Sequence, residues 1–309
     1  MKIFIPIVIS FFLSSCSVAG SNGDNNIVAS HKQAPGSFSF LFMCDIHLHP
    51  DSGAVEGFKK AIDTANKLRA DFVLTGGDLV FDALGVSFAR ADSLFQLYKK
   101  TIALFTKPVY NTIGNHDVFG IYPESKVSKA HPDYKYGMYQ RYLGDTYYSF
   151  DHKGWHFVVM NSVGEKDGKY IGIIEEEQKS WLEQDLSKIH PQMPIAVVVH
   201  IPFLSTYYQR YKRAANPRSP EGAFITNRNE VLNMFDKHNL KLVLQGHTHW
   251  IEDINIKNKI RFITGGSISG HSWRGNKDVE KGFMKFSVKE EDISWEYIDY
   301  GWNTINAGK

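Results

Sequence analysis

The stretch Phe40-Leu41-Phe42-Met43-Cys44-Asp45-Ile46-His47 joins a continuous apolar run to an Asp-x-His motif. A short apolar run of this kind is typical of a strand buried on both faces of a sheet. Alternate side chains of a strand point the same way, so Asp45 and His47 would extend together from its carboxyl end. Ligands of open α/β sheets bind beyond the carboxyl ends of strands. The stretch therefore predicts a buried strand with a functional site at its end.

Four further apolar runs end in similar polar motifs. The motifs are Gly76-Gly77-Asp78 after Phe72–Thr75, Gly114-Asn115-His116-Asp117 after residues 109–113, His200 after residues 195–199, and Gly246-His247-Thr248-His249 after residues 240–244. Amphipathic helical patterns over residues 55–68 and 86–105 lie between the first three runs. This alternation of strand and helix predicts an α/β fold with a mainly parallel or mixed sheet covered by helices.

The rest of the chain adds further strands and helices. Strands are predicted over residues 147–151, 156–161, 251–256, 260–264, 283–288 and 293–297, and helices over 175–189 and 227–238. Residues 118–140 are rich in tyrosine and predict irregular structure. No repeat or Pro/Gly-rich linker divides residues 37–309, so one domain is expected there.

Five strand ends would bring carboxylate, imidazole and amide groups to one rim of the fold. These are the groups that bind first-row metals in proteins. The glycines that precede Asp78, Asn115 and His247 allow the backbone to turn tightly beside a ligand. The predicted metal ligands are Asp45, His47, Asp78, Asn115, His200, His247 and His249.

The ordered set of motifs resembles the calcineurin-like metallophosphoesterase superfamily, and most closely its bacterial cyclic-nucleotide phosphodiesterase-type branch. The likeness extends to Tyr142-Leu-Gly-Asp-Thr-Tyr-Tyr-Ser-Phe-Asp151, Trp155-His-Phe-Val-Val-Met-Asn-Ser162, Gln178-Lys-Ser-Trp-Leu-Glu-Gln-Asp-Leu186 and His200-Ile-Pro-Phe203. It covers residues 38 to 265. It implies a four-layer α/β/β/α sandwich of two mixed β-sheets flanked by helices.

The resemblance also implies a dinuclear metal centre. One metal would take Asp45, His47, Asp78 and His249, and the other Asp78, Asn115, His200 and His247, with Asp78 bridging. Two metals about 4 Å apart would acidify a bridging water and clamp the phosphoryl oxygens. The metals would be divalent or trivalent ions such as Fe, Mn or Zn. His116 would not be a ligand; it would neutralise charge in the transition state or protonate the leaving oxygen.

The implied activity is hydrolysis of a phosphomonoester or phosphodiester, with Asp78, Asn115 and His116 as catalytic residues and a small phosphorylated molecule as substrate. Hydrolysis of a cyclic nucleotide or another phosphodiester specifically is one alternative. A surface lipoprotein that binds metal or a phosphorylated ligand without turnover is another. Loss of ligands is usual in such non-catalytic relatives, whereas all the ligand positions are filled here.

One position departs from the family pattern. The family often carries an acid three residues after the Gly-Asp aspartate, where it orients the His of Gly-Asn-His; here that residue is Phe81. Asp82 and Asp117 are both candidates for the partner of His116. Purple acid phosphatases have an iron-binding Tyr at the same offset, and because Phe81 cannot bind a metal, it argues against a purple iron site.

Two loops hold candidate substrate contacts. In Ser269-Gly-His-Ser-Trp-Arg-Gly275, Trp273 would stack a base or sugar and Arg274 would hold a phosphate, beside His271; a packed surface-loop Trp is the alternative. Arg210 and Arg213 lie in a basic loop after His200, which would steer phosphate or remain a solvated loop. His49, two residues after His47, is expected to face solvent, and a contact with substrate is the alternative.

The amino terminus resembles the signal of a bacterial lipoprotein. Lys2 precedes an apolar run that ends in Leu13-Ser14-Ser15-Cys16, and this pattern predicts a signal peptide over residues 1–15. A lipid on Cys16 would anchor an exported protein to a membrane, in the periplasm or at the cell surface. Residues 16–36, which are rich in Ser, Asn and Gly, would form a flexible tether.

The composition limits the remaining possibilities. The 309 residues include 35 Lys and Arg against 33 Asp and Glu, a formal net charge of +2. This balance provides no broad basic surface, so binding to nucleic acid is not expected. Of the 2 cysteines, Cys44 alone lies in the predicted domain, which excludes a disulfide framework there.

Overall fold

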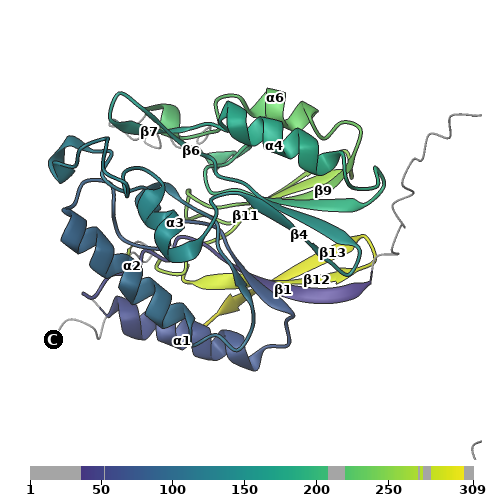
Figure 1. Ribbon diagram of the computed structural model, residues 1–309. Helices are drawn as coiled ribbons and strands as arrows, with labels where there is room; N and C mark the ends of the chain where they lie inside the picture. The colour runs from purple at the N-terminus through teal and green to yellow at the C-terminus, as the bar shows by residue number, and fades with distance from the viewer. Residues whose placement is uncertain (1–35, 52, 208–219, 271, 274–279, 303–309) are drawn as a thin grey trace, which may run out of the picture. The chain divides into compact units, whose positions relative to one another are not determined.

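The computed structural model describes residues 36–51, 53–207, 220–270, 272–273 and 280–302. Two mixed β-sheets form the centre of the fold, and they pack face to face (Figure 1). The first sheet has the strand order β13-β12-β1-β2-β3 and the second β10-β11-β9-β8-β5-β4. A separate hairpin pairs β6 (Val163–Lys166) with β7 (Lys169–Gly172).

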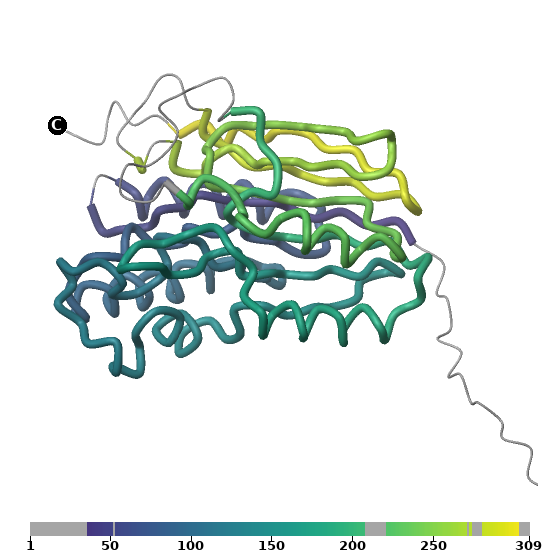
Figure 2. The backbone as a smooth tube through the Cα atoms, turned by 90° about the horizontal axis from the view of Figure 1, so that it is seen from above, coloured from purple at the N-terminus to yellow at the C-terminus, as the bar shows by residue number. Residues whose placement is uncertain are grey.

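The strands of the first sheet are β1 (Ser37–Met43), β2 (Phe72–Thr75), β3 (Val109–Tyr110), β12 (Gly282–Lys289) and β13 (Asp292–Asp299). β1, β2 and β3 run parallel, and β12 joins β1 antiparallel, so the end of the chain pairs with its first strand (Figure 2). The strands of the second sheet are β4 (Tyr148–His152), β5 (Trp155–Val159), β8 (Pro194–Val198), β9 (Asn239–Gln245), β10 (Glu252–Ile256) and β11 (Ile260–Thr264). There β5, β8, β9 and β11 run parallel.

Aromatic side chains fill the space between the sheets. The ring of Phe40 lies between Phe72 and Phe286, with centroid distances of 5.4 and 4.8 Å and nearly parallel planes. Phe150 and Phe157 stack at 5.0 Å in the second sheet. Large apolar rings contribute most of the buried area in a core of this kind, so this layer holds the two sheets in one arrangement.

Helices cover the outer face of each sheet (Figure 1). α1 (Ala54–Lys67), α2 (Phe88–Ile102) and α3 (Gly137–Leu143) lie on the side of the first sheet, and α4 (Glu176–Leu186) and α6 (Arg228–Asn233) on the side of the second. The buried face of α1 carries Phe58, Ala61, Ile62 and Ala65, which recur at helical spacing. The predicted α/β class and the arrangement of two mixed sheets flanked by helices are therefore confirmed.

Several elements differ from the sequence prediction. The third predicted strand extends only over Val109–Tyr110, because the chain then turns toward the short helix η1 (Asn115–Asp117). α3 begins within the region 118–140, which was predicted to be irregular, and the hairpin of β6 (Val163–Lys166) and β7 (Lys169–Gly172) was not predicted. Two more short helices are η2 (Pro123–Ser125) and η3 (Pro220–Gly222).

The amino-terminal predictions concern a different part of the chain. The described residues all belong to one compact unit. The predicted signal peptide, Cys16 and nearly all of the predicted tether lie outside the described residues. In the described part of the chain, no helix is both long and apolar enough to cross a membrane.

Candidate metal centre

The predicted ligands converge from the carboxyl ends of parallel strands in both sheets. Asp45 and His47 follow β1, Asp78 follows β2, Asn115 lies in η1 after β3, His200 follows β8, and His247 and His249 follow β9. All their side chains are at least partly buried. The sequence predicted this meeting point from the strand ends alone.

A first group of ligand atoms comes from Asp45, His47 and His249. Nε2 of His249 lies 3.1 Å from Nε2 of His47 and 3.2 Å from Oδ1 of Asp45. Nε2 of His47 lies 3.9 Å from the same Asp45 oxygen. Asp45 Oδ1 is buried and has no hydrogen-bond partner among the described residues.

A second group comes from Asn115, His200 and His247. Nε2 of His200 lies 3.1 Å from Oδ1 of Asn115 and 3.3 Å from Nδ1 of His247. Asp78 is common to both groups, because its Oδ2 lies 3.2 Å from Nε2 of His200 and 3.7 Å from Nε2 of His47.

Backbone carbonyls set the direction of two imidazoles. Nδ1 of His200 lies 2.7 Å from the carbonyl oxygen of Gly76, and Nδ1 of His249 lies 3.0 Å from that of Gly270. In a neutral ring, each Nδ1 then carries the hydrogen and donates it, which leaves Nε2 with a free lone pair directed into the centre.

These atoms fit a pair of bound cations. Lone pairs on nitrogen and oxygen face one another in both groups, an arrangement that repels unless a positive charge lies between them. With metal–ligand bonds of about 2.1 Å, neighbouring ligand atoms are about 3.0 Å apart in an octahedron and about 3.4 Å apart in a tetrahedron. The distances of 3.1 to 3.3 Å around His200 and around the His47–His249 pair fall in this range.

The electrostatics of the ligands also indicate a site for positive charge. Burial lowers the pKa of His200, but the Asp78 and Asp45 carboxylates outweigh it and raise that pKa to about 9. Burial and the neighbouring His200 lower the pKa of His247 to about 3. Burial opposes ionisation of Asp78, yet His200 and His116 hold its pKa well below the usual value. Asp78, and Asp45, whose pKa is also lowered, despite burial, by the nearby His249, therefore stay ionised and attract cations.

His116 lies beside the ligands, and its side chain is 23% exposed. Its Nδ1 lies 3.5 Å from Oδ2 of Asp82, and its Nε2 lies 4.0 Å from Oδ2 of Asp78. Burial lowers the pKa of His116, but Asp78 and Asp82 outweigh it and raise the pKa to about 9. The ring of Phe81 stacks on the imidazole at 5.4 Å.

The structure distinguishes the two candidate partners of His116. The Asp117 carboxylate accepts hydrogen bonds from the backbone N–H groups of Leu79, Val80 and Gly114 at 2.8 to 3.0 Å. The Asp117 carboxylate is therefore directed at the backbone around Asp78 and supports the loop that carries Asp78. Asp82 is the acid that faces the imidazole, one position later than in the family pattern.

Two predicted positions differ in the structure. Trp273 is only 1% exposed, and its Nε1 donates to the carbonyl oxygen of Ile46 at 2.8 Å, so the prediction that it stacks a base or sugar is wrong. His49 is 6% exposed and its ring contacts Phe81, so the expectation of a solvent-facing His is also wrong. The other predicted substrate contacts, His271, Arg274, Arg210 and Arg213, lie outside the described residues.

The sequence did not identify the residues that support the ligands. The hydroxyl of Ser162 accepts hydrogen bonds from the backbone N–H groups of His200 and Ile201 at 3.2 and 2.8 Å. Oε1 of Gln245 accepts hydrogen bonds from the backbone N–H groups of Phe203 and Leu204, which follow Ile201 by two and three residues. No motif marks such residues, because a single Ser or Gln at a strand end is common.

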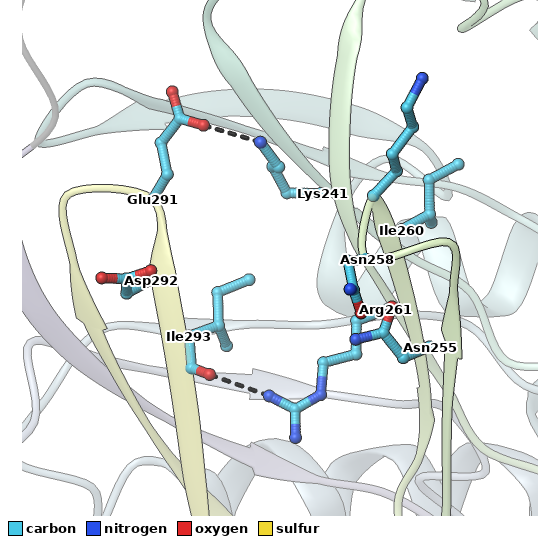
Figure 3. Close-up of a pocket in the computed structure, with 9 residues that line it drawn as sticks. Lys241, Asn255, Asn258, Ile260, Arg261, Glu291, Asp292 and Ile293 are labelled. Carbon is cyan, nitrogen blue, oxygen red and sulfur yellow. Dashed lines mark hydrogen bonds and ion pairs between the residues drawn. The ribbon is translucent and has the colours of Figure 1, made fainter.

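A polar recess of about 350 Å³ lies at the other end of the sheets, near the beginnings of β9 and β11 (Figure 3). Its charged groups are largely paired: Lys241 contacts Glu291 at 2.8 Å, and Arg261 contacts Asp253 and the carbonyl oxygen of Ile293. The metal ligands follow the carboxyl end of β9, so this recess is separate from the candidate metal centre.

Comparison with known proteins relates this centre to a family. The model described as calcineurin-like phosphoesterase matches residues 38–250. A probable cyclic nucleotide phosphodiesterase of Moraxella catarrhalis is 24% identical in an alignment 241 residues long, which covers 74% of this chain and 76% of that protein. Purple acid phosphatase 7 of Arabidopsis thaliana is 24% identical in an alignment 315 residues long, gaps included, which covers 89% of this chain and 86% of that protein.

The solved structures show the same fold. A dimetal phosphatase from Danio rerio superposes with a TM-score of 0.60 at 15% identity. The superposition covers 86% of this chain and 97% of the Danio rerio chain. At this identity the likeness concerns the arrangement of sheets and helices.

Proposed function

The chain belongs to the calcineurin-like phosphoesterase family, and on this premise we propose that it hydrolyses phosphate esters with two metal ions bound at the rim of its two sheets. Asp45, His47, Asp78 and His249 would hold one ion. Asp78, Asn115, His200 and His247 would hold the other.

The position of Asp78 Oδ2 carries this proposal. The oxygen lies 3.7 Å from Nε2 of His47 in one group and 3.2 Å from Nε2 of His200 in the other. A single carboxylate oxygen between two sets of ligands is what a bridging ligand requires. It would keep two cations close enough to act on one phosphoryl group.

The bound metals would supply Lewis acidity, activating water and neutralising charge on the phosphoryl oxygens. The chain itself supplies His116. Asp82 faces its Nδ1, which directs Nε2 toward the metal ligands. In that position the protonated ring would donate a proton to the leaving oxygen or stabilise its negative charge.

Two kinds of ester suit this centre. The names of the two relatives support a phosphodiester in one case and a phosphomonoester in the other. The ring of Phe81 lies beside that of His47, with 5.6 Å between the ring centroids, and it supplies no phenolate oxygen, which argues against an iron–tyrosine site.

The proposal is tested with protein stripped by a chelator and reloaded with Mn²⁺. Hydrolysis of p-nitrophenyl phosphate and of bis-p-nitrophenyl phosphate is followed as metal is added. Activity should be absent without metal and should rise to its limit as the second equivalent binds; the preferred ester then identifies a monoesterase or a diesterase. Two bound metals with no hydrolysis of either ester would favour the alternative, a binding protein without turnover.

The amino terminus supports a further part of the proposal, namely export and anchoring. The Leu13-Ser14-Ser15-Cys16 sequence supports lipidation of Cys16, with the catalytic unit held at a membrane in the periplasm or at the cell surface. A small phosphorylated molecule, rather than nucleic acid, would be its substrate.

A further inference from the structure

A cluster of residues from the loop after β11 holds the backbone of the first strand end. We refer to Ser267, Ile268, Ser269, Gly270 and Trp273 as the latch residues. They donate hydrogen bonds to the backbone carbonyl oxygens of four successive residues. Ile268 N donates to Cys44 O at 3.0 Å, and the hydroxyls of Ser267 and Ser269 donate to Asp45 O at 2.8 and 2.9 Å. Nε1 of Trp273 donates to Ile46 O and His47 O at 2.8 and 3.2 Å.

The latch residues also orient a ligand from the second sheet. The carbonyl oxygen of Gly270 lies 3.0 Å from Nδ1 of His249, which directs Nε2 of that ring toward Asp45 and His47. One short segment thus positions Asp45, His47 and His249, the three residues of the first group.

The second group has other supports. His200 is held by the carbonyl of Gly76 and the hydroxyl of Ser162, both outside the latch. Among the described residues, the latch residues form no hydrogen bond with Asn115, His200 or His247. Most of the hydrogen-bonded supports of the two groups are therefore separate. Asp78 is common to both groups, and the backbone N–H of His247 donates to Oδ2 of Asp45 at 3.2 Å.

Packing makes the latch rigid. Trp273 is buried against α1, where Gly57 leaves room for it: a Cβ atom on Gly57 would lie 2.2 Å from the indole ring. Asp45 and His47 have φ angles of 54° and 48°, a region that residues other than glycine seldom adopt. Hydrogen bonds to their carbonyls hold this backbone in place.

From these contacts we infer that the latch residues position the ligands of one of the two metals. Their loss should leave the affinity for the other metal unchanged. The inference rests on the proposed dinuclear centre. Hydrogen-bond partners of metal ligands typically change metal affinity 10- to 100-fold when they are removed. Loss of a latch side chain should therefore weaken one binding event by about this factor.

The test uses calorimetric titration of Mn²⁺ into the chelator-treated full-length protein, with thermal unfolding measured in parallel. Ser269→Ala removes one hydroxyl and Trp273→Phe removes one indole N–H. Each substitution should lower the affinity for one equivalent of metal 10- to 100-fold and leave the affinity for the other equivalent unchanged. Ser269→Thr, which keeps the hydroxyl, should retain two tight sites.

Two further variants serve as controls. Trp155→Phe removes an equally buried indole whose Nε1 donates to the carbonyl of Glu290 at 2.7 Å, away from the metal centre, so both affinities should stay as in the wild type. Ser162→Ala, which removes a hydrogen bond to the backbone of His200, should by itself lower the affinity for one equivalent of metal. In combination with Ser269→Ala it should lower the affinity for both equivalents, because the two changes act on different metals.

The outcomes separate this inference from the proposed function. If the wild-type protein binds fewer than two metals, the dinuclear proposal fails. If it binds two, and Ser269→Ala weakens both equally or neither, the latch inference is wrong while the dinuclear proposal stands. Ser269→Ala removes a single oxygen atom and decides the result even if Trp273→Phe does not fold.

Discussion

Five of the proposed metal ligands have backbone φ angles in the left-handed region. The angles are 54° for Asp45, 48° for His47, 52° for Asp78, 74° for His247 and 63° for His249. A residue with a side chain is disfavoured there by about 1–3 kcal/mol, and it stays there only when its surroundings fix it. Backbone bonds from Asp45 N to Gly77 O and from His47 N to Asp78 O provide part of that support. The ligands are thus arranged by the fold, ready to receive metal.

His116 should contribute to chemistry and not to metal binding. His116→Ala should keep both metals and lower the rate about 10²–10⁴-fold for an ester with an alkoxide leaving group. The loss should be smaller for p-nitrophenolate, which leaves with little need for a proton. Metal content and turnover on an alkyl and an aryl phosphate are measured together. Release of a metal by this substitution would show that His116 is a ligand.

Asp82 and Asp117 should have different effects, because only Asp82 faces His116. Asp82→Asn should lower turnover about 10-fold or more with little change in the unfolding temperature. Burial and the neighbouring Asp78 raise the pKa of Asp117 to about 7, so the comparison is made at pH 8, where this carboxyl is ionised. There Asp117→Asn removes the charge and replaces one accepting oxygen by an NH₂ group, so it should lower the free energy of unfolding by about 1.5–3 kcal/mol. Kinetics and urea unfolding of both variants check this assignment. Equal stability loss in the two variants would contradict it.

At the scale of elements, the strands that carry the ligands could be predicted from sequence. β2 has the predicted limits, Phe72–Thr75, and β8 and β9 differ from the prediction by only one residue at each end. The agreement is close because the apolar runs of these strands are short and uninterrupted. α3 has seven residues and begins at Gly137, too short for a helical pattern to be recognised. The β6 strand, Val-Gly-Glu-Lys, has no alternation of apolar and polar residues.

The positions of loop side chains could not be predicted in the same way. Trp273 lies in a Gly/Ser-rich loop, where sequence alone does not distinguish a stacking surface from a packed ring. Its burial depends on the space left by Gly57 of α1, more than 200 positions earlier in the chain. Likewise, Asp117 directly follows His116, whereas Asp82 precedes it by 34 positions, and only the folded backbone shows that the more distant acid is the one that faces the imidazole.

A buried histidine joins β5 to β4 and α4. Nδ1 of His156 contacts Asp151 at 2.7 Å and Nε2 contacts Asp185 at 2.9 Å; His238 is the other titratable group beside it. Burial lowers the pKa of His156, but the two carboxylates outweigh it and raise the pKa above the usual 6.5. Burial opposes ionisation of Asp185, yet His156 lowers the pKa of that carboxyl below the usual 3.8.

The sign of the pH dependence follows from these shifts. The raised pKa of His156 stabilises the fold fully below pH 6.5, and this stabilisation is lost as pH rises through the folded-state pKa. Because Asp151 is 62% exposed, we expect a contribution of only about 1–2 kcal/mol. Urea unfolding at pH 6 and pH 9 should show that His156→Gln loses stability mainly at pH 6. An equal loss at both values would rule out a charged His156.

At the scale of the whole molecule, the metal centre joins the two sheets. Asp45, His47, Asp78 and Asn115 come from the first sheet and its connections, and His200, His247 and His249 from the second. The aromatic layer between the sheets keeps these two sets in register. The seven ligands specify where a phosphoryl group would bind, whereas the choice of ester is made by other side chains, which motifs at strand ends do not specify.

The anchor and the catalytic unit should be separable. Residues 17–34 form a predicted coil with a root-mean-square reach of roughly 20–25 Å, enough to hold the rim away from a bilayer. Cys16→Ser should therefore release a protein with unchanged kinetics toward small esters. Membrane fractionation and detergent partitioning of both forms check this. A Cys16→Ser protein that remains on the membrane would contradict the lipid anchor.

The proposed dinuclear centre depends most on Asp78, which would hold both catalytic metals. Metal content, determined together with turnover of an aryl phosphate, is measured for the wild type, Asp78→Asn and the exposed control Asp63→Asn. The wild type and the control should bind two metals and have full activity. Asp78→Asn should lose at least one metal and about 10³-fold or more in rate, because an amide oxygen carries no charge to hold two cations. Two retained metals and a near-normal rate in Asp78→Asn would show that Asp78 is not a bridging ligand.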